Sequence, residues 1–115
     1  MNQLIKSFKY AFQGILSIFK LERNFKIHSI IAVLVVILGI ILKISCLEWC
    51  IILLCFALVL SVEMINTVLE QTANLISPLK DDTIGRIKDI AAGAVLVCVI
   101  FSIIIGLIIF IPKVF

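Results

Sequence analysis

The chain has 115 residues, of which 63% are hydrophobic, and its formal net charge at pH 7 is +3. A soluble domain of this length is rarely so apolar, because only about half of the residues of an average globular domain are apolar. The composition therefore predicts one all-α integral membrane domain over residues 1–115 and leaves too few polar residues for a separate soluble domain. Nothing in the charge pattern indicates a nucleic-acid partner.

The N-terminal segment 3–20 has the pattern of an amphipathic helix. Apolar residues recur at helical spacing from Leu4 to Phe19, while Lys6 and Lys9 fall among the polar residues of the other face. This pattern is typical of a helix that lies on a membrane surface. Packing against a soluble core is the alternative, but no such core remains. The basic start also predicts that no cleavable signal peptide is present.

Three apolar segments are predicted to span the membrane, over residues 27–47, 49–76 and 88–112. A tight turn is expected at Ser45–Glu48, with Lys43 close enough to the outer interface to extend its amine into water. Trp49 suits the interface where the second span begins. Ser77-Pro78 is expected to end that span, and a polar loop is expected over Leu79–Arg86.

Basic residues are distributed unequally between the two sides of the predicted spans. Only Lys43 and Lys113 lie on one side. The other side carries Lys6, Lys9, Lys20, Arg23, Lys26, Lys80, Arg86 and Lys88. The positive-inside rule therefore places the N-terminus and the second loop in the cytosol.

The four cysteines, Cys46, Cys50, Cys55 and Cys98, lie in apolar surroundings and form no C-x-x-C pair. They are interpreted as small apolar residues rather than metal ligands. A disulfide between Cys46 and Cys50 on the outer side is the alternative.

The second span carries an unusual polar stripe in the segment VEMINTVLEQTANL, residues 62–75. Asn66, Glu70 and Asn74 follow Glu63 at offsets that keep all four on one helix face. With Trp49 at the outer interface, Glu63 falls roughly 9 Å inside the hydrocarbon boundary and Glu70 reaches the cytosolic interface. A carboxylate at the bilayer centre costs about 2.5–3.5 kcal/mol. This cost favours a function over the alternatives, which are helix–helix hydrogen bonding and a simple interfacial charge at Glu70.

Further charges are expected at the depth of Glu70. Glu22 precedes the first span, and Lys88 and Asp89 open the third, so these residues are predicted to cluster with Glu70. Carboxylate oxygens suit Mg²⁺, and a lysine beside them can bind phosphate. Because no P-loop motif is present, a nucleotide site would be assembled from these residues. Glu63, inside the membrane boundary, suits a general base that serves a lipid hydroxyl.

These motifs also carry a family resemblance. The segment VEMINTVLEQTANL, with ERNFKIH before the first span and KDIAAGAVL after the second loop, resembles the prokaryotic diacylglycerol kinase family. This family includes the undecaprenol kinases of Gram-positive bacteria. The resemblance covers essentially the whole chain. It implies a homotrimeric bundle of three-span chains in the bacterial plasma membrane, which uses ATP and Mg²⁺ to phosphorylate a membrane lipid alcohol on the cytoplasmic side.

The resemblance also implies roles for individual residues. Glu63 matches the catalytic base, and Asn66 supports the site. Glu22 and Glu70 match the metal ligands. Besides these two glutamates, the residues matched to the ATP site are Tyr10, Leu79, Lys80, Asp81, Lys88 and Asp89. Lys88 and Asp89 are also matched to catalysis. Such sites lie between neighbouring subunits.

Three positions depart from the family pattern: Val68 and Ile87 replace alanines, and Asn74 stands where aspartate is expected. None of these changes removes a residue assigned to chemistry, but Asn74 lowers the local negative charge. The segments ERNFKIH and AAGAVL resemble the Gram-positive branch more closely. They favour conversion of undecaprenol to undecaprenyl phosphate, with diacylglycerol to phosphatidic acid as the alternative. His28 is interpreted as an interfacial hydrogen-bonding residue.

A small proton-coupled multidrug transporter is the competing function from another class. Such a transporter would be expected to have four spans and its carboxylate in the first span, whereas this sequence predicts three spans with the deepest carboxylate in the second. A purely structural or pore-forming membrane protein would leave Glu22, Glu70, Lys88 and Asp89 without a role.

Overall fold

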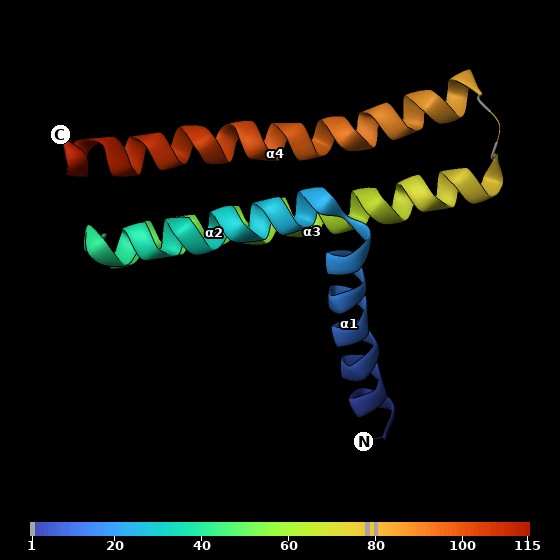
Figure 1. Ribbon diagram of the computed structural model, residues 1–115, viewed down its shortest axis with the longest axis horizontal. Helices are drawn as coiled ribbons and strands as arrows, with labels where there is room; N and C mark the ends of the chain where they lie inside the picture. The colour runs from blue at the N-terminus through green and yellow to red at the C-terminus, as the bar shows by residue number, and fades with distance from the viewer. Residues whose placement is uncertain (1, 78, 80) are drawn as a thin grey trace.

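The computed structural model describes residues 2–77, 79 and 81–115. The described residues form four α-helices: α1 (Asn2–Leu21), α2 (Arg23–Ile41), α3 (Cys46–Ile76) and α4 (Asp82–Val114). Helices α2, α3 and α4 are each long and apolar enough to cross a membrane. Figure 1 shows these three helices running along one direction, with α1 extending across it. The predicted all-helical architecture with three candidate spans is therefore confirmed.

Aromatic packing fixes the corner between α1 and α2. The rings of Phe19 and Phe25 meet edge to face with their centroids 4.8 Å apart. Ile18 and Phe25 are both buried at this corner. An aromatic pair of this kind contributes about 0.5–1.5 kcal/mol beyond the burial of its surface. The contact therefore stabilises the angle between α1 and α2, at which α1 extends away from the other helices (Figure 1).

The first span ends earlier than predicted. Helix α2 ends at Ile41 rather than at 47, and the following turn includes Lys43 in the left-handed region, with φ of 52°. Helix α3 then begins at Cys46, because Ser45 and Glu48 form a capping box in which each side chain accepts a hydrogen bond from the other residue's backbone N–H. The prediction of a turn at Ser45–Glu48 is thus wrong. The S-x-x-E spacing is a helix-start signal.

The third span begins earlier than predicted, at Asp82 rather than at 88. The Asp81 carboxylate accepts hydrogen bonds from the backbone N–H groups of Thr83 and Ile84, at 2.8 and 3.3 Å. An acidic residue at the N-cap satisfies free N–H groups and complements the helix dipole. The predicted polar loop is therefore helical from Asp82 onward. With 31 and 33 residues, α3 and α4 are each longer than a hydrocarbon core of about 30 Å requires.

The packed core lies at the end of the bundle that contains the α2–α3 turn. Its centre consists of three buried isoleucines, Ile44, Ile52 and Ile109. Trp49 packs against this centre. At the same end, the amine of Lys113 lies 3.0 Å from a carboxylate oxygen of Glu48, so the end of α4 is paired with the start of α3. All four cysteines are free thiols, which excludes a Cys46–Cys50 disulfide in this structure.

We expect Gly39→Ala to destabilise the α2–α3 hairpin. An added Cβ at Gly39 would lie 2.8 Å from the Cη2 atom of Trp49, which is closer than van der Waals contact allows. Overpacking of this kind lowers the free energy of unfolding by about 1–3 kcal/mol. Denaturation in detergent micelles measures the effect, with Gly14→Ala as the control because nothing lies within 4 Å of a Cβ there. Equal stability of the two variants would contradict the close approach at Gly39.

Candidate active site

A hydrogen bond between α2 and α3 joins the deepest predicted site residue to a histidine. Glu63 is buried, with 6% of its surface exposed. Its Oε2 atom lies 2.8 Å from Nδ1 of His28, although the two residues are 35 positions apart in the chain. The sequence predicted the carboxylate but not this partner. Counting outward from the α2–α3 turn indicates only that the two residues lie at similar depths, because His28 lies 15 residues before Lys43 and Glu63 lies 18 residues after Ser45.

An apolar cleft of about 390 Å³ lies between α2, α3 and α4. Val35, Phe56 and Ile103 are among its lining residues, one from each helix. Both α2 and α4 pack against α3, so α3 forms the side of the cleft that joins the other two helices. Among the described residues that line the cleft, only His28 and Cys55 have a titratable side chain. The His28–Glu63 pair therefore borders an apolar space within the spanning helices.

A second, polar cavity of about 800 Å³ lies where α3 ends and α4 begins. Four residues predicted to bind nucleotide line it, namely Leu79, Asp81, Lys88 and Asp89. The amine of Lys88 donates a hydrogen bond of 2.8 Å to the side-chain oxygen of Asn74, another lining residue. Arg86 also lines the cavity, although the sequence indicated only its contribution to orientation. Lys80, which was also predicted to bind nucleotide, lies outside the described residues.

Exposure increases along the polar stripe of α3. Glu63 is buried, Asn66 is half-buried, and Glu70 and Asn74 are exposed. At the buried end, the Thr67 hydroxyl donates to the backbone oxygen of Glu63 at 3.1 Å. The stripe thus connects the buried carboxylate to the polar end of α3.

The predicted acidic cluster does not form within one chain. Over residues 2–77, 79 and 81–115, no group of three or more His, Cys, Asp or Glu side chains could hold a metal ion. One chain alone therefore does not bring Glu22, Glu70 and Asp89 together as a three-carboxylate group, and metal binding by Glu22 and Glu70 stays a prediction. Residue counting predicts depth along a helix, whereas contact also depends on the side from which each side chain leaves it. Tyr10, on α1, is 65% exposed and lines neither cavity.

Comparison with known proteins identifies the family. The family described as prokaryotic diacylglycerol kinase matches residues 9–110. The chain belongs to this family. It is 42% identical over 113 residues to the undecaprenol kinase of Bacillus subtilis, covering 98% of this chain and 92% of that protein.

Two diacylglycerol kinases are more distant relatives of this kinase. The enzyme from Synechocystis is 35% identical, with 90% of this chain and 59% of that protein covered. The enzyme from Haemophilus influenzae is 29% identical, with 84% and 82% covered. Membership of the family makes the chain a bacterial membrane lipid kinase with a lipid substrate and a nucleotide phosphoryl donor. The transporter alternative has no support, because the described residues contain three candidate spans and the matched relatives are kinases.

Proposed function

We propose that this kinase uses ATP and Mg²⁺ to phosphorylate undecaprenol, forming undecaprenyl phosphate. The observation that carries the proposal is the buried His28–Glu63 pair, whose His28 lines the apolar cleft, so Glu63 can serve as a base near a space suited to a lipid chain. The 42% identity to an undecaprenol kinase supports this acceptor. Diacylglycerol is the second candidate, supported by two relatives named diacylglycerol kinases.

Glu63 is the proposed general base. With the lipid chain in the cleft, the terminal hydroxyl lies at the end bordered by His28 and donates to the Glu63 carboxylate. As the hydroxyl oxygen attacks the γ-phosphorus of ATP, its proton passes to Glu63 and the bond to ADP breaks. The half-buried Asn66, one turn further along the same face, supports the site.

Nucleotide binding is proposed at the polar cavity between α3 and α4. Lys88, held by Asn74, presents its charge to the phosphates. Leu79, Asp81 and Asp89 line the cavity, and the proposed ATP site also includes Lys80 and Tyr10. The hard carboxylate oxygens of Glu22 and Glu70 suit Mg²⁺, which neutralises phosphate charge when bound.

A homotrimer is proposed because one chain does not assemble these groups. Glu22 and Tyr10 are absent from the lining of the polar cavity, and the described residues form no group of three or more His, Cys, Asp or Glu side chains that could hold a metal ion. Many large apolar side chains are exposed on α3 and α4, including Leu54, Ile65 and Ile108, and can pack against neighbouring chains. In the proposed assembly, residues of adjacent subunits complete each site.

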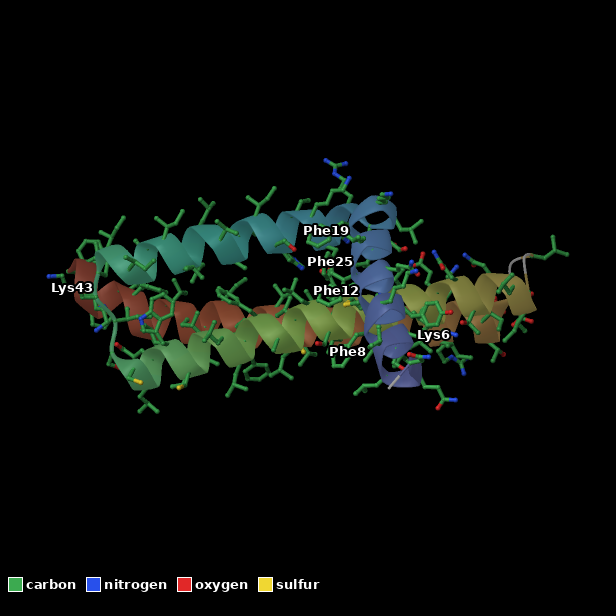
Figure 2. The ribbon with its side chains drawn as sticks, turned by 90° about the horizontal axis from the view of Figure 1, so that it is seen from below. Lys6, Phe8, Phe12, Phe19, Phe25 and Lys43 are labelled. Carbon is green, nitrogen blue, oxygen red and sulfur yellow. The ribbon has the colours of Figure 1, made fainter. Side chains whose placement is uncertain are left out.

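Helix α1 is proposed to lie on the cytoplasmic membrane surface. Figure 2 shows Phe8 and Phe12 on the side of α1 toward the end of the bundle that carries Lys43, and Lys6 on the opposite side. Aromatic side chains on one face and lysines on the other suit a helix at a lipid–water interface. The proposed location of the N-terminus and the α3–α4 connection in the cytosol is supported by the distribution of basic residues.

The acceptor is tested by offering undecaprenol and diacylglycerol side by side to the purified kinase in mixed micelles with ATP. We expect faster transfer to undecaprenol, and loss of transfer when Mg²⁺ is chelated. Faster transfer to diacylglycerol would overturn the proposed acceptor and leave the lipid kinase assignment intact. Transfer to neither lipid would contradict the proposed function.

Replacement of the base should remove turnover. We expect Glu63→Gln to lower kcat by at least about 100-fold, because general base catalysis contributes about 10²–10⁴-fold. Nucleotide binding, measured separately by equilibrium titration, should change little. Glu48→Gln is the matched control, since Glu48 is a carboxylate of the same helix that lies at the outer end and pairs with Lys113. A Glu63→Gln enzyme with full kcat would rule out the base assignment.

The hydrogen bond to Lys88 generates a separate prediction. Asn74→Ala removes the acceptor, and we expect the KM for ATP to rise by about 2- to 10-fold, the range for losing roughly 0.5–1.5 kcal/mol. Asn74→Asp keeps an acceptor in place and should preserve the KM. Thr72→Ala is the control, because the Thr72 hydroxyl donates to the backbone oxygen of Val68 within α3. An unchanged KM in Asn74→Ala would show that the bond does not position Lys88 for nucleotide.

A further inference from the structure

His28 supplies the hydrogen bond that holds the Glu63 carboxylate. Nδ1 of His28 lies 2.8 Å from Oε2 of Glu63, and the two side chains are 23% and 8% exposed. Within the described residues, no other side chain forms a hydrogen bond to this carboxylate. The nearby Thr67 hydroxyl donates to the Glu63 backbone oxygen instead. The orientation of the carboxylate therefore depends on α2.

The chemistry of the two groups fixes the direction of this hydrogen bond. An ionised carboxylate can only accept, so Nδ1 of His28 must carry the proton whenever Glu63 is ready to act as a base. This bond occupies Oε2 and leaves Oε1 with free lone pairs. A lipid hydroxyl can donate to Oε1 while Oε2 stays bound to the imidazole.

The apolar surroundings of Glu63 make the hydrogen bond from His28 important for the position of its carboxylate. A glutamate side chain has several rotatable bonds, and the neighbouring cleft is lined almost entirely by apolar residues, which cannot orient a carboxylate. General base catalysis requires the base within hydrogen-bond reach of the proton that it removes. Without the imidazole, the carboxylate would lose its one side-chain partner and its fixed position relative to the cleft.

We propose that His28 is a positioning residue for phosphoryl transfer, which holds the Glu63 carboxylate by its Nδ1–H so that Oε1 faces the acceptor hydroxyl. The inference rests on the proposed role of Glu63 as the base. The lipid hydroxyl proton goes to Oε1 of Glu63, and His28 neither touches the phosphate nor takes this proton in the transfer step.

Three variants at position 28 test this role. His28→Ala removes the donor, and we expect kcat to fall by up to about 100-fold, the effect of a base displaced by about 1 Å. The KM for ATP should stay within about twofold, because His28 does not line the polar cavity proposed for the nucleotide. His28→Asn places an amide nitrogen where Nδ1 lies and should restore most of kcat. His28→Gln places its amide one bond further out and should restore less.

Ser29→Ala is the matched control on α2. The Ser29 hydroxyl is buried and has no hydrogen-bond partner among the described residues, so its removal should leave kcat unchanged. Thermal unfolding of each variant in detergent shows whether α2 and α3 still pack. If His28→Ala does not fold, the comparison of His28→Asn with His28→Gln still decides the question, and equal kcat in these two variants would count against positioning through Nδ1.

A second experiment separates positioning from a purely structural contact. His28→Ala is combined with Glu63→Gln, and the residual kcat is compared with that of Glu63→Gln alone. No further loss is expected, since the imidazole then has no base to position. An equal loss in both backgrounds would show that His28 acts only through folding and would overturn the inference. If Glu63→Gln abolishes turnover while His28→Ala keeps full kcat, this inference fails and the base assignment stands.

Discussion

Glu63 must keep a hydrogen-bond partner within an apolar bundle, because burying a polar group without one costs about 2–7 kcal/mol and burying an unpaired charge costs more. The partner, His28, comes from α2, so the carboxylate depends on the packing of α2 against α3. Toward the opposite end of the hairpin, Gly39 of α2 leaves room for the ring of Trp49 of α3. Contacts distant from the chemistry therefore maintain the pair at the centre of the candidate site.

The bundle separates apolar and polar surroundings along its length. Buried isoleucines and the Glu48–Lys113 ion pair occupy the end with the α2–α3 turn, the apolar cleft lies between the helices, and the polar cavity lies at the α3–α4 connection. A lipid kinase has to bring together an acceptor that stays in the membrane and a nucleotide that stays in water. The polar stripe of α3 connects the two regions, since its exposure rises from Glu63 to Asn74.

The sequence predicted the four helices and the buried carboxylate because both depend on strong one-dimensional patterns. Hydropathy and residue spacing are local properties, and α3 ends at Ile76 as its pattern indicated. The helix starts at Cys46 and Asp82 were misplaced because polar residues at Ser45 and Asp81 were interpreted as loops rather than as caps.

Side-chain pairs between helices were the least predictable features. His28 pairs with Glu63, whereas Glu22 and Asp89 do not meet Glu70 in an acidic cluster within one chain. Depth alone does not distinguish these cases, because each side chain also has a direction around its helix. The hydrogen bond between Lys88 and Asn74 also depends on the direction in which each side chain leaves its helix. An amide at position 74 supplies the acceptor without placing a negative charge beside the lysine.

The Glu48–Lys113 ion pair also limits how α3 and α4 can move relative to each other. The two antiparallel helices are joined at one end by the short connection after Ile76 and paired at the other end by this contact. A piston-like slide of one helical turn, about 5.4 Å, would pull Lys113 away from Glu48. Tilting and bowing preserve the contact. The ion pair therefore favours the observed axial register of α3 and α4, and a slide of one turn would have to break it.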